Sequence, residues 1–534
     1  MSINIIILSI VLSCFSTSVM SYVALATPIG PWIAPTLVFI ALLFSKLFFR
    51  MSATGIAHAV SAGSIGGIVA TACAFSFPTI YFLDSVTFNT WMQSPLFFSG
   101  LLGIFSFLAG SFGLLVADYA EKTLIDVQNL SFPIGQLVNK MIAAQDQIKK
   151  AYELMIGFCV TAVFSFLQGG IFLSRSIIPK VVTLLPSTQF LMFSLPQIVI
   201  NFDTAPMVWA IGFVTGHVIA LPLAAGACAN MLLVHPLQRS FFSYLSSMEF
   251  TLAFCSGIVL YITAMSIIGM PKQLIDGTKK YINGFAGNSF VPKHFFSAQS
   301  IGFISVLTVA LIAFFSYFKF PYYVQFYLII CSIITTYQIA AIAGRIGLAL
   351  LGRFATFVMV PAMLMFNINY VHMVLIATFV EISGGVAADV LFGRKLAQLS
   401  DISRATMRRY QLLGLLISSC SIGIIFWLLI NHFGLGSPEL FAYRAQSRQL
   451  LIQAQQFDYT VLGIGALFGL LLQKINLNPM LVLGGLLMPL DMTFGLVVGG
   501  LLAMAARDKE EWYPFWSGVF ASNSIIMLLR AIFA

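Results

Sequence analysis

The sequence predicts an all-α, polytopic integral membrane protein, on the basis of its composition and of the length of its apolar runs. Of the 534 residues, 59% are hydrophobic and 8% are charged, whereas roughly 25% of the residues in an average soluble chain are charged. The apolar residues form repeated runs of about 20 residues, the length that crosses a hydrocarbon core of roughly 30 Å.

Apolar runs bounded by charged or turn residues predict sixteen membrane spans in two groups of eight. The first group is 3–24, 30–49, 56–83, 95–117, 151–174, 181–203, 206–233 and 247–270. The second group is 297–318, 323–344, 351–368, 371–392, 411–431, 457–473, 477–506 and 514–533. Two segments, 181–203 and 477–506, each contain two prolines, which leaves open whether they cross fully or are broken or re-entrant.

The basic residues predict the orientation of the chain. Lys and Arg are concentrated on the flanks that an amino terminus in the cytoplasm would place inside, as the positive-inside rule requires. We keep 181–203 as a crossing, because without it the basic segments 272–293 and 394–409 would fall outside. Residues 1–22 lack a basic leader and are therefore predicted to be a retained span. The short loops suit a bacterial inner membrane.

The two groups of spans share one plan, which predicts a parallel repeat. Each has four spans, a basic segment (118–150 or 393–410) and four more spans. We therefore expect a first repeat at 1–270, a cytoplasmic linker at 271–296 and a second repeat at 297–534. Each repeat also has an aspartate beside a proline, Asp203 or Asp491, before a Gly-rich helix. Such interrupted segments mark binding sites in transporters, although each carboxylate could simply cap its helix.

Glu381 is an ionisable carboxyl inside the apolar segment 371–392. A charge near the bilayer centre costs roughly 2.5–3.5 kcal/mol on insertion scales, so it is rarely placed there without a partner or a task. One hypothesis is a group that faces the translocation path and binds a proton or a cationic part of the substrate. The alternative is a carboxyl that locks two helices together by pairing with Arg345 or Arg353.

Other polar residues inside or beside the spans have functional and structural alternatives. Asp389 follows Glu381 by eight residues on roughly the same helix face, but with Lys395 it could be simple interfacial charge. His217 is either a proton relay or a packing residue. Tyr337 and Gln338 could hydrogen-bond a ligand or a neighbouring helix.

Metal sites, cofactors and enzymatic chemistry are not predicted. No His or carboxylate cluster has metal-ligand spacing, and the seven cysteines lie in apolar runs without a Cys-x-x-Cys motif. The HExxH, GxSxG and Walker motifs are missing, so energy coupling would come from an ion gradient or a separate subunit. An intramembrane lipid-modifying enzyme would need a metal-binding Asp/His cluster, and a scaffold subunit would leave Glu381 unexplained.

Four stretches resemble the oligopeptide transporter family, which includes the yellow-stripe-like metal-chelate transporters. Residues 130–135 (Leu-Ser-Phe-Pro-Ile-Gly) are similar to its Leu-x-Phe-Pro-Ser-Gly segment, and residues 203–226 resemble its Ser-Pro…Gly-x-x-x-Gly helix. Residues 387–395 match the spacing of its Asp-Leu-Met-Gln-Asp-Phe-Lys loop, with Gly393 in place of the second Asp. Residues 499–521 resemble its carboxy-terminal Gly-Gly…Gly-x-x-x-Gly pattern.

The resemblance implies a bacterial-type secondary active transporter that imports oligopeptides or peptide-like substrates together with protons. The alternative within the family is an importer of metal chelates or siderophores. Glu381 and Asp389 are then the candidates for proton coupling. The candidate substrate-binding residues are Asp203, Asp491, Arg345, Tyr337, Gln338, His217 and Lys395. The expected partners are the substrate, protons and the lipid bilayer, without nucleic acid, and a homo-oligomer is left open.

Overall fold

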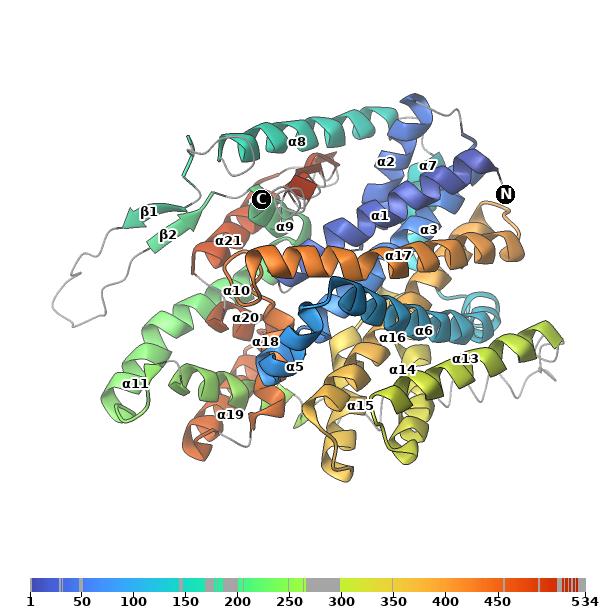
Figure 1. Cartoon of the computed structure of the whole chain (residues 1–534). Helices are drawn as coiled ribbons and strands as arrows, with labels where there is room; N and C mark the ends of the chain where they lie inside the picture. Colours follow the sequence, from blue (N-terminus) through green and yellow to red (C-terminus); the bar gives the residue numbers. More distant parts are fainter. Residues whose placement is uncertain are drawn as a thin grey trace. The chain divides into compact units, whose positions relative to one another are not determined.

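The computed structural model shows a largely helical chain (Figure 1). It describes residues 2–27, 30, 32–47, 51–143, 147–168, 177–179, 181–185, 200–204, 206–247, 249–262, 264–265, 298–347, 349–454, 457–487, 490–506, 511–512, 514–516, 518–519, 522–523 and 525–526. The chain divides into two compact units, each described by itself below. The first unit comprises Met1–Ala24, Trp32–Gln147 and Ser266–Trp427, and the second comprises Leu25–Pro31, Ile148–Met265 and Leu428–Ala534.

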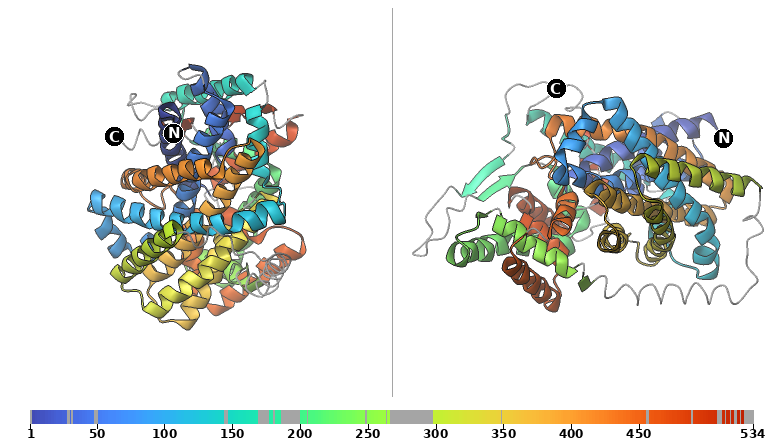
Figure 2. Two further views of the ribbon diagram at one scale, coloured as in Figure 1. Left: turned by 90° about the vertical axis from the view of Figure 1, so that its right-hand side faces the viewer. Right: turned by 60° about the horizontal axis from the view of Figure 1, so that its bottom comes forward.

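The described secondary-structure elements of the first unit are all helices. Its elements are α1 (Ile3–Ala26), α2 (Ala34–Leu47), α3 (Ala53–Ser76), α4 (Thr79–Leu83), α5 (Ser85–Met92), α6 (Pro95–Glu121), the π-helical turn η1 (Lys122–Val127), α7 (Pro133–Ala143), α13 (Ala298–Tyr317), α14 (Tyr322–Ile346), α15 (Leu351–Met365), α16 (Tyr370–Leu399) and most of α17 (Arg404–Phe433). Figure 2 shows helices from both predicted repeats interleaved in this unit.

The second unit contains helices and one strand pair. Its elements are α8 (Gln147–Leu167), β1 (Val181–Leu185), β2 (Ile200–Asp203), α9 (Pro206–Thr215), α10 (His217–Ala229), the π-helical turn η2 (Asn230–Val234), α11 (His235–Phe241), a helix at Glu249–Ile262, α18 (Tyr443–Ile452), α19 (Tyr459–Lys474), α20 (Pro479–Leu487) and α21 (Leu490–Ala505). Each unit therefore contains residues from both predicted repeats.

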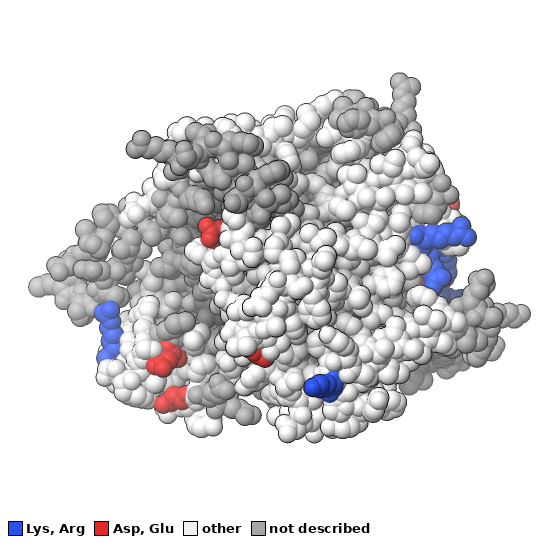
Figure 3. Space-filling view, in the orientation of Figure 1, with Lys and Arg blue, Asp and Glu red and all other residues white. Residues whose placement is uncertain are grey.

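The described helices fit an integral, multi-pass membrane protein. Seven of them are long and apolar enough to cross a membrane, namely Ile3–Ala26, Ala53–Leu83, Pro95–Val127, Ala220–Phe241, Tyr322–Gly344, Tyr370–Leu399 and Arg404–Phe433. Shorter apolar helices coincide with several further predicted spans. The face in Figure 3 has very few charged side chains among its described residues, as expected of a surface that meets lipid.

The helix α16 forms the centre of the first unit. It packs against α3, α6, α14 and α15, and every residue from His372 to Ala397 is buried. Small residues permit this close packing: a Cβ atom on Gly113 of α6 would lie 2.2 Å from the backbone oxygen of Ser383. The helix that sequence analysis singled out is thus enclosed by protein on all sides.

Contacts along α16 establish the direction of its neighbours. The helix α6 runs parallel to α16, because Phe105 contacts Phe379 near their beginnings and Glu121 meets Arg394 near their ends. The helix α14 is also parallel to α16, since Phe318, just before it, meets the start of α16, and Thr336 meets its middle.

The helix α3 runs antiparallel to α16, because Ser64 meets Asp389 and the later Ser76 meets the earlier Glu381. The helices α13, α15 and α17 are antiparallel to α16 as well. Since α1 is parallel to α3 along their common contact, the amino terminus lies at the same end of the unit as the last turns of α6 and α16.

The two ends of the first unit differ in charge. We call the end where α6 and α16 finish the basic end. The Lys and Arg residues at or next to it are Lys46, Lys122, Lys140, Arg345, Arg353, Arg394, Lys395, Arg404, Arg408 and Arg409. Among the described residues of this unit, Lys319 is the one lysine or arginine at the opposite end. We call that opposite end the aromatic end, because Trp91, Tyr317, Phe318 and Tyr370 gather there.

The segment 181–203 differs from the predicted helical span. Its described ends are the strands β1 and β2, which pair antiparallel with Val181 opposite Asp203. The β-branched run Val181-Val-Thr183 and the segment Ile200-Asn-Phe-Asp203 favour this extended pairing. The described ends of the segment are therefore paired strands and not parts of a helix, whereas its crossing of the membrane stays a prediction. Residues 186–199, with both prolines, lie outside the described residues.

Other predicted segments are subdivided in the structure. The span 206–233 is interrupted at Gly216, which has φ 76° and separates α9 from α10; this conformation favours glycine. The span 477–506 appears as α20 and α21, on either side of Met488 and Pro489, which lie outside the described residues. The helix α18, in the loop predicted at 432–456, was not predicted. The linker 271–296 also lies outside the described residues.

Helices of the second unit meet where glycines face each other. In each crossing, a Cβ atom on either glycine would lie within about 2.1 Å of a backbone oxygen of the opposite helix. Because glycine has no side chain, the backbones of these helices can touch, as in other closely packed membrane helices. The four pairs are Gly157 with Gly518, Gly212 with Gly499, Gly226 with Gly485, and Gly257 with Gly465.

Candidate functional site

Glu381 lies in the middle of α16 with none of its surface exposed. The hydroxyl of Ser76, on α3, donates a hydrogen bond to Oε2 of the carboxyl. Gly384 and Gly385 bring the neighbouring helices close, since a Cβ atom at these positions would lie 2.3 Å from Ile339 and 2.8 Å from Ile68. The carboxyl is therefore surrounded by protein and does not face the acyl chains.

Asp389 occupies the same side of α16, toward α3. Its side chain is 2% exposed, and the Ser64 hydroxyl donates a hydrogen bond of 2.6 Å to Oδ2. At 1.5 Å per residue, it lies about 12 Å along the helix from Glu381. Asp389 is therefore buried inside the protein beside a hydroxyl group, and its role in proton coupling stays a prediction.

Two further hydroxyl groups lie between these carboxyls along α16. Thr336 of α14 and Ser383 of α16 are hydrogen-bonded at 3.0 Å. Tyr337 and Gln338 follow Thr336 directly, with Gln338 buried and Tyr337 partly buried. These two residues therefore belong to the helix beside α16, and their contact with a ligand stays a prediction.

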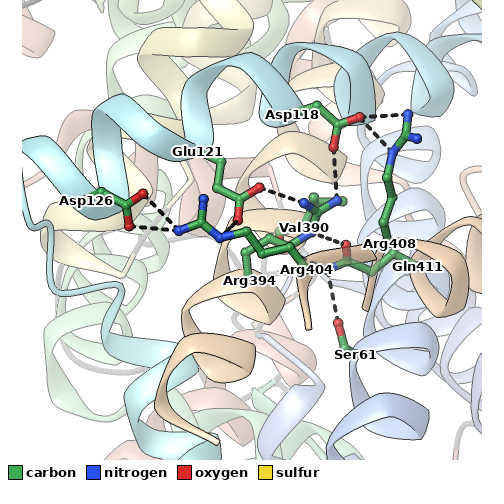
Figure 4. A network of polar contacts seen from close by, with 9 residues as sticks. All are labelled: Ser61, Asp118, Glu121, Asp126, Val390, Arg394, Arg404, Arg408 and Gln411. Carbon is green, nitrogen blue, oxygen red and sulfur yellow. Dashed lines mark hydrogen bonds and ion pairs between the residues drawn. The ribbon is translucent and has the colours of Figure 1, made fainter. Parts of the chain in front are cut away.

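At the basic end, Arg394 is the centre of a buried ion network (Figure 4). Its guanidinium lies 2.6 Å from Oε2 of Glu121 and 2.9 Å from Oδ1 of Asp118, both at the end of α6. Its Nε donates to Oε1 of Gln411 on α17 at 2.8 Å. Since Arg394 is only 4% exposed, these partners supply the hydrogen bonds that water would otherwise make.

Two more arginines from α17 extend this network. Arg408 contacts Oδ2 of Asp118 at 2.9 Å, and Arg404 contacts Oε1 of Glu121 at 3.2 Å and Asp126 at 2.8 Å. Asp126 lies in the π-helical turn η1, whose wider winding follows directly after α6. Three arginines and three carboxylates thus join α6, α16 and α17 (Figure 4).

Gln411 connects the network to the backbone beside Asp389. Its amide nitrogen donates to the Val390 carbonyl at 3.0 Å and to the Ser61 hydroxyl at 3.1 Å. A Cβ atom on Gly393 would lie 2.1 Å from that hydroxyl. The structure thus gives a physical reason for the glycine at this position of the 387–395 stretch: there is no room for a side chain.

The remaining predicted residues of the first unit have different surroundings. Lys395 is buried, and its Nζ donates to Oε1 of Gln398 at 3.0 Å. Arg353 is exposed, which does not fit a buried pair with Glu381. Arg345 lies in the last turn of α14, and its side chain lies outside the described residues.

Asp203, His217 and Asp491 belong to the second unit. Asp203 ends β2, His217 begins α10 directly after Gly216, and Asp491 is the second residue of α21. Their side chains lie outside the described residues. The structure therefore places three predicted residues at the ends of secondary-structure elements and brings Glu381 and Asp389 onto one helix face.

A cavity of about 480 Å³ lies at the aromatic end of the first unit. It is formed by three segments: α5 with its N-cap residue Asp84, the turn between α13 and α14, and the start of α16. Asp84 and Lys319 place opposite charges in its lining, beside Trp91 and His372. Sequence analysis missed this cavity. The aspartate of the segment 84–87 (Asp-Ser-Val-Thr), a pattern typical of helix N-caps, is the local signal that was available.

The fold and the buried polar groups define the class of this chain as a polytopic α-helical membrane protein. A family model described as OPT oligopeptide transporter protein matches residues 1–523. The chain therefore belongs to the OPT oligopeptide transporter family, which confirms the resemblance seen in the sequence. Members of this family are membrane transporters of oligopeptide-like substrates and are not enzymes. No curated protein matches the chain.

Proposed function

We propose that the chain is a secondary active transporter that imports oligopeptides or small peptide-like substrates together with protons. Glu381 carries this proposal, because a fully buried carboxyl in the middle of a 30-residue helix is costly to maintain without a task. Its neighbour Ser76 suits a proton-binding role: a hydroxyl donates to the ionised carboxylate and can accept from the protonated acid.

Asp389 is the second proton-binding group in this proposal. Like Glu381, it accepts a hydrogen bond from a serine hydroxyl of α3. The hydrogen-bonded pair of Thr336 and Ser383 lies between the two carboxyls. Buried polar groups therefore occur on the α3 and α14 sides of α16 from its middle toward the basic end.

The charge difference between the two ends supports an orientation. We place the basic end of the first unit, with the amino terminus, in the cytoplasm of a bacterial cell, and the aromatic end outside its inner membrane. This assignment does not depend on the segment 181–203, because the directions of the helices within one unit place 394–409 at the same end as the amino terminus.

Helix direction also supports the parallel repeat. The helices α1, α2, α3 and α6 alternate in direction in the same order as α13, α14, α15 and α16. Each unit takes elements from both sequence repeats. In the proposed architecture, each repeat has eight membrane segments and contributes residues to both units. The segment 181–203 is then a re-entrant segment of the first repeat.

The substrate-binding residues are proposed for each unit by itself. In the second unit, Asp203 and Asp491 would bind the ammonium group of a peptide, and the first amides of α10 would bind its carboxylate. In the first unit, Arg345 and Lys395 are the candidates for binding a carboxylate. His217, Tyr337 and Gln338 would add hydrogen bonds. The interruption at Gly216 supports this assignment, because it leaves the ends of α9 and α10 available to a ligand.

Uptake into proteoliposomes with an imposed pH gradient tests this function. We expect labelled trialanine to accumulate against its gradient with the wild-type protein, and a labelled ferric chelate to do so if the chelate alternative is correct. Glu381→Gln should abolish gradient-driven accumulation while retaining exchange of peptide for peptide. Glu511→Gln, a matched change at an exposed glutamate, should behave as wild type.

Two results would contradict the proposal. Full accumulation by Glu381→Gln would remove this carboxyl from the coupling mechanism. If neither the peptide nor the chelate enters vesicles containing folded wild-type protein, import of both substrate classes is excluded.

A further inference from the structure

We propose that the cavity at the aromatic end of the first unit binds a short zwitterionic peptide, with Asp84 contacting its ammonium group and Lys319 its carboxylate. The inference rests on the proposed function in one respect only, the orientation that turns this end outward. On that orientation the cavity is the place where a peptide first meets the transporter, and it is separate from Glu381.

The size and lining of the cavity suit a small amphiphilic ligand. Its volume of about 480 Å³ lies within the range of roughly 300–1,000 Å³ found for small-molecule sites. Trp91 and Phe318 meet edge to face, with ring centroids 5.8 Å apart, and provide an apolar wall. An aromatic ring can also attract an ammonium group through its π face.

Asp84 is held in position while part of its hydrogen-bonding capacity remains available. It is the N-cap of α5: Oδ1 accepts from the Thr87 backbone nitrogen at 3.1 Å, and Oδ2 accepts from the Thr87 hydroxyl at 2.6 Å. A carboxylate oxygen has a second lone pair. Each oxygen can therefore also accept a hydrogen bond from a ligand ammonium group without disturbing the cap.

Lys319 has a left-handed backbone conformation, with φ 58°. Such a conformation costs free energy for a residue with a long side chain, and it persists only where the surroundings determine it. Here the Lys319 nitrogen donates to the Ser316 carbonyl at 2.9 Å. Glycine or asparagine would adopt this turn more easily, so the surrounding contacts hold the lysine at this position.

His372 fixes the turn that carries Lys319. Its Nε2 lies 2.7 Å from the Phe318 carbonyl oxygen, and because a carbonyl only accepts, Nε2 is the donor. The imidazole also packs on Phe320, with ring centroids 4.1 Å apart. The first turn of α16 and the turn after α13 are thereby joined, which keeps the lysine at the rim of the cavity.

The pair of opposite charges selects the class of ligand. An anionic chelate would be attracted by Lys319 and repelled by Asp84, whereas a peptide with free termini offers one group to each residue. The two charges lie on separate segments, α5 and the α13–α14 turn. In the proposed complex they bind the two ends of one extended peptide.

Equilibrium binding to the full-length protein in lipid nanodiscs tests this inference. The probe is labelled Ala-Phe-Ala with free termini, compared with its N-acetyl and C-amide forms. Asp84→Asn keeps the helix cap, because asparagine caps as well as aspartate, and Lys319→Asn suits the left-handed turn. Each variant should weaken binding of the free peptide about tenfold, the loss expected when one charge-assisted hydrogen bond is removed.

The blocked peptides make the assignment specific. Asp84→Asn should leave the affinity for the N-acetyl peptide unchanged, and Lys319→Asn should leave the affinity for the C-amide peptide unchanged, because the relevant ligand charge is already missing. An equal loss for all three peptides, no loss for the free peptide, or no saturable binding to the wild-type protein would overturn the inference.

The same measurement separates this inference from the proposed function. Glu511→Gln, at an exposed glutamate outside both sites, should bind the free peptide as wild type does. If the pattern of variants and blocked peptides holds but no uptake occurs, the binding site stands and the transport proposal falls. If uptake behaves as proposed but the pattern is missing, the binding site alone is refuted.

Discussion

Glycines form close helix contacts in both units, as at Gly113 in the first, but the first unit adds buried contacts made by ionisable side chains. In the first unit, helices meet through hydrogen bonds between buried polar groups, among them Ser64 with Asp389 and Arg394 with Glu121. In the second unit, the crossings are made by glycines such as Gly212 and Gly499, where backbone touches backbone.

This difference bears on which unit can respond to protons. A contact between a carboxyl and a hydroxyl can exist in two protonation states, and its strength depends on which state is present. A contact between two glycines has no titratable group and depends only on shape. The first unit therefore has the chemistry of a proton-sensitive element, while the glycine crossings of the second unit give it fixed helix spacing.

The largest expected effect follows from removing the buried charge of Arg394. We expect Arg394→Gln to lower the free energy of unfolding by about 3–5 kcal/mol, because buried Glu121 and partly buried Asp118 would lose their buried arginine and keep only the more exposed Arg404 and Arg408. Arg409→Gln removes the same charge from an exposed residue of the same end and should change stability little. Denaturant titration in detergent measures both.

A similar loss for the two arginine variants would show that total charge, and not the buried contact, holds this end of the first unit together.

The second prediction concerns a glycine crossing. In Gly465→Ala, the new Cβ would lie 2.1 Å from the Phe254 carbonyl oxygen, so the helix at 249–262 and α19 must separate. We expect a loss of about 1–3 kcal/mol, as found for overpacked cores. Gly463→Ala, two residues earlier, meets nothing within 4 Å and should be neutral or slightly stabilising. Thermal unfolding compares the pair.

If the two alanine variants unfold at the same temperature, backbone contact does not set the helix spacing in this unit, and the comparison above fails.

The smallest effect is expected at an exposed contact of the second unit. The hydroxyl of Tyr244 donates to Oδ2 of Asp458 at 3.0 Å, and this hydrogen bond raises the pKa of Tyr244, because deprotonation would break it. Because the pKa of Tyr244 is higher in the folded state, this hydrogen bond stabilises the fold below the unfolded-state pKa of about 10. The stabilisation is lost as the pH rises through the folded-state pKa.

Tyr244→Phe should therefore unfold at a slightly lower temperature than wild type at pH 8, and the difference should vanish in strongly alkaline buffer. A difference that persists unchanged at high pH would mean that the ring, and not the hydroxyl, makes the contact.

Local features of the sequence predicted much of the first unit. The apolar lengths located α1, α6, α14, α16 and α17, because a membrane helix needs about 20 apolar residues wherever it lies. The eight-residue spacing placed Glu381 and Asp389 on one helix face, and both meet serines of α3. The ordered glycine and proline motifs identified the family.

Long-range contacts could not be predicted in the same way. Arg394 and Glu121 are far apart in the sequence, and their meeting depends on the parallel packing of α6 and α16. The cavity likewise joins three separate segments. The strands β1 and β2 were mistaken for a helix because a short apolar run fits either structure, and only the pairing of its two ends decides between them.

The enclosure of α16 limits how the protein can move. Since every residue from His372 to Ala397 is covered by neighbouring helices, this helix can neither turn about its axis nor slide without emptying a packed interior. A carboxyl on such a helix gains or loses access to water in two ways. Either the whole surrounding helix bundle moves, or water enters the bundle from one end. The substrate-bound protein should therefore move as a few rigid bodies, and Glu381 should move together with the body that contains α16.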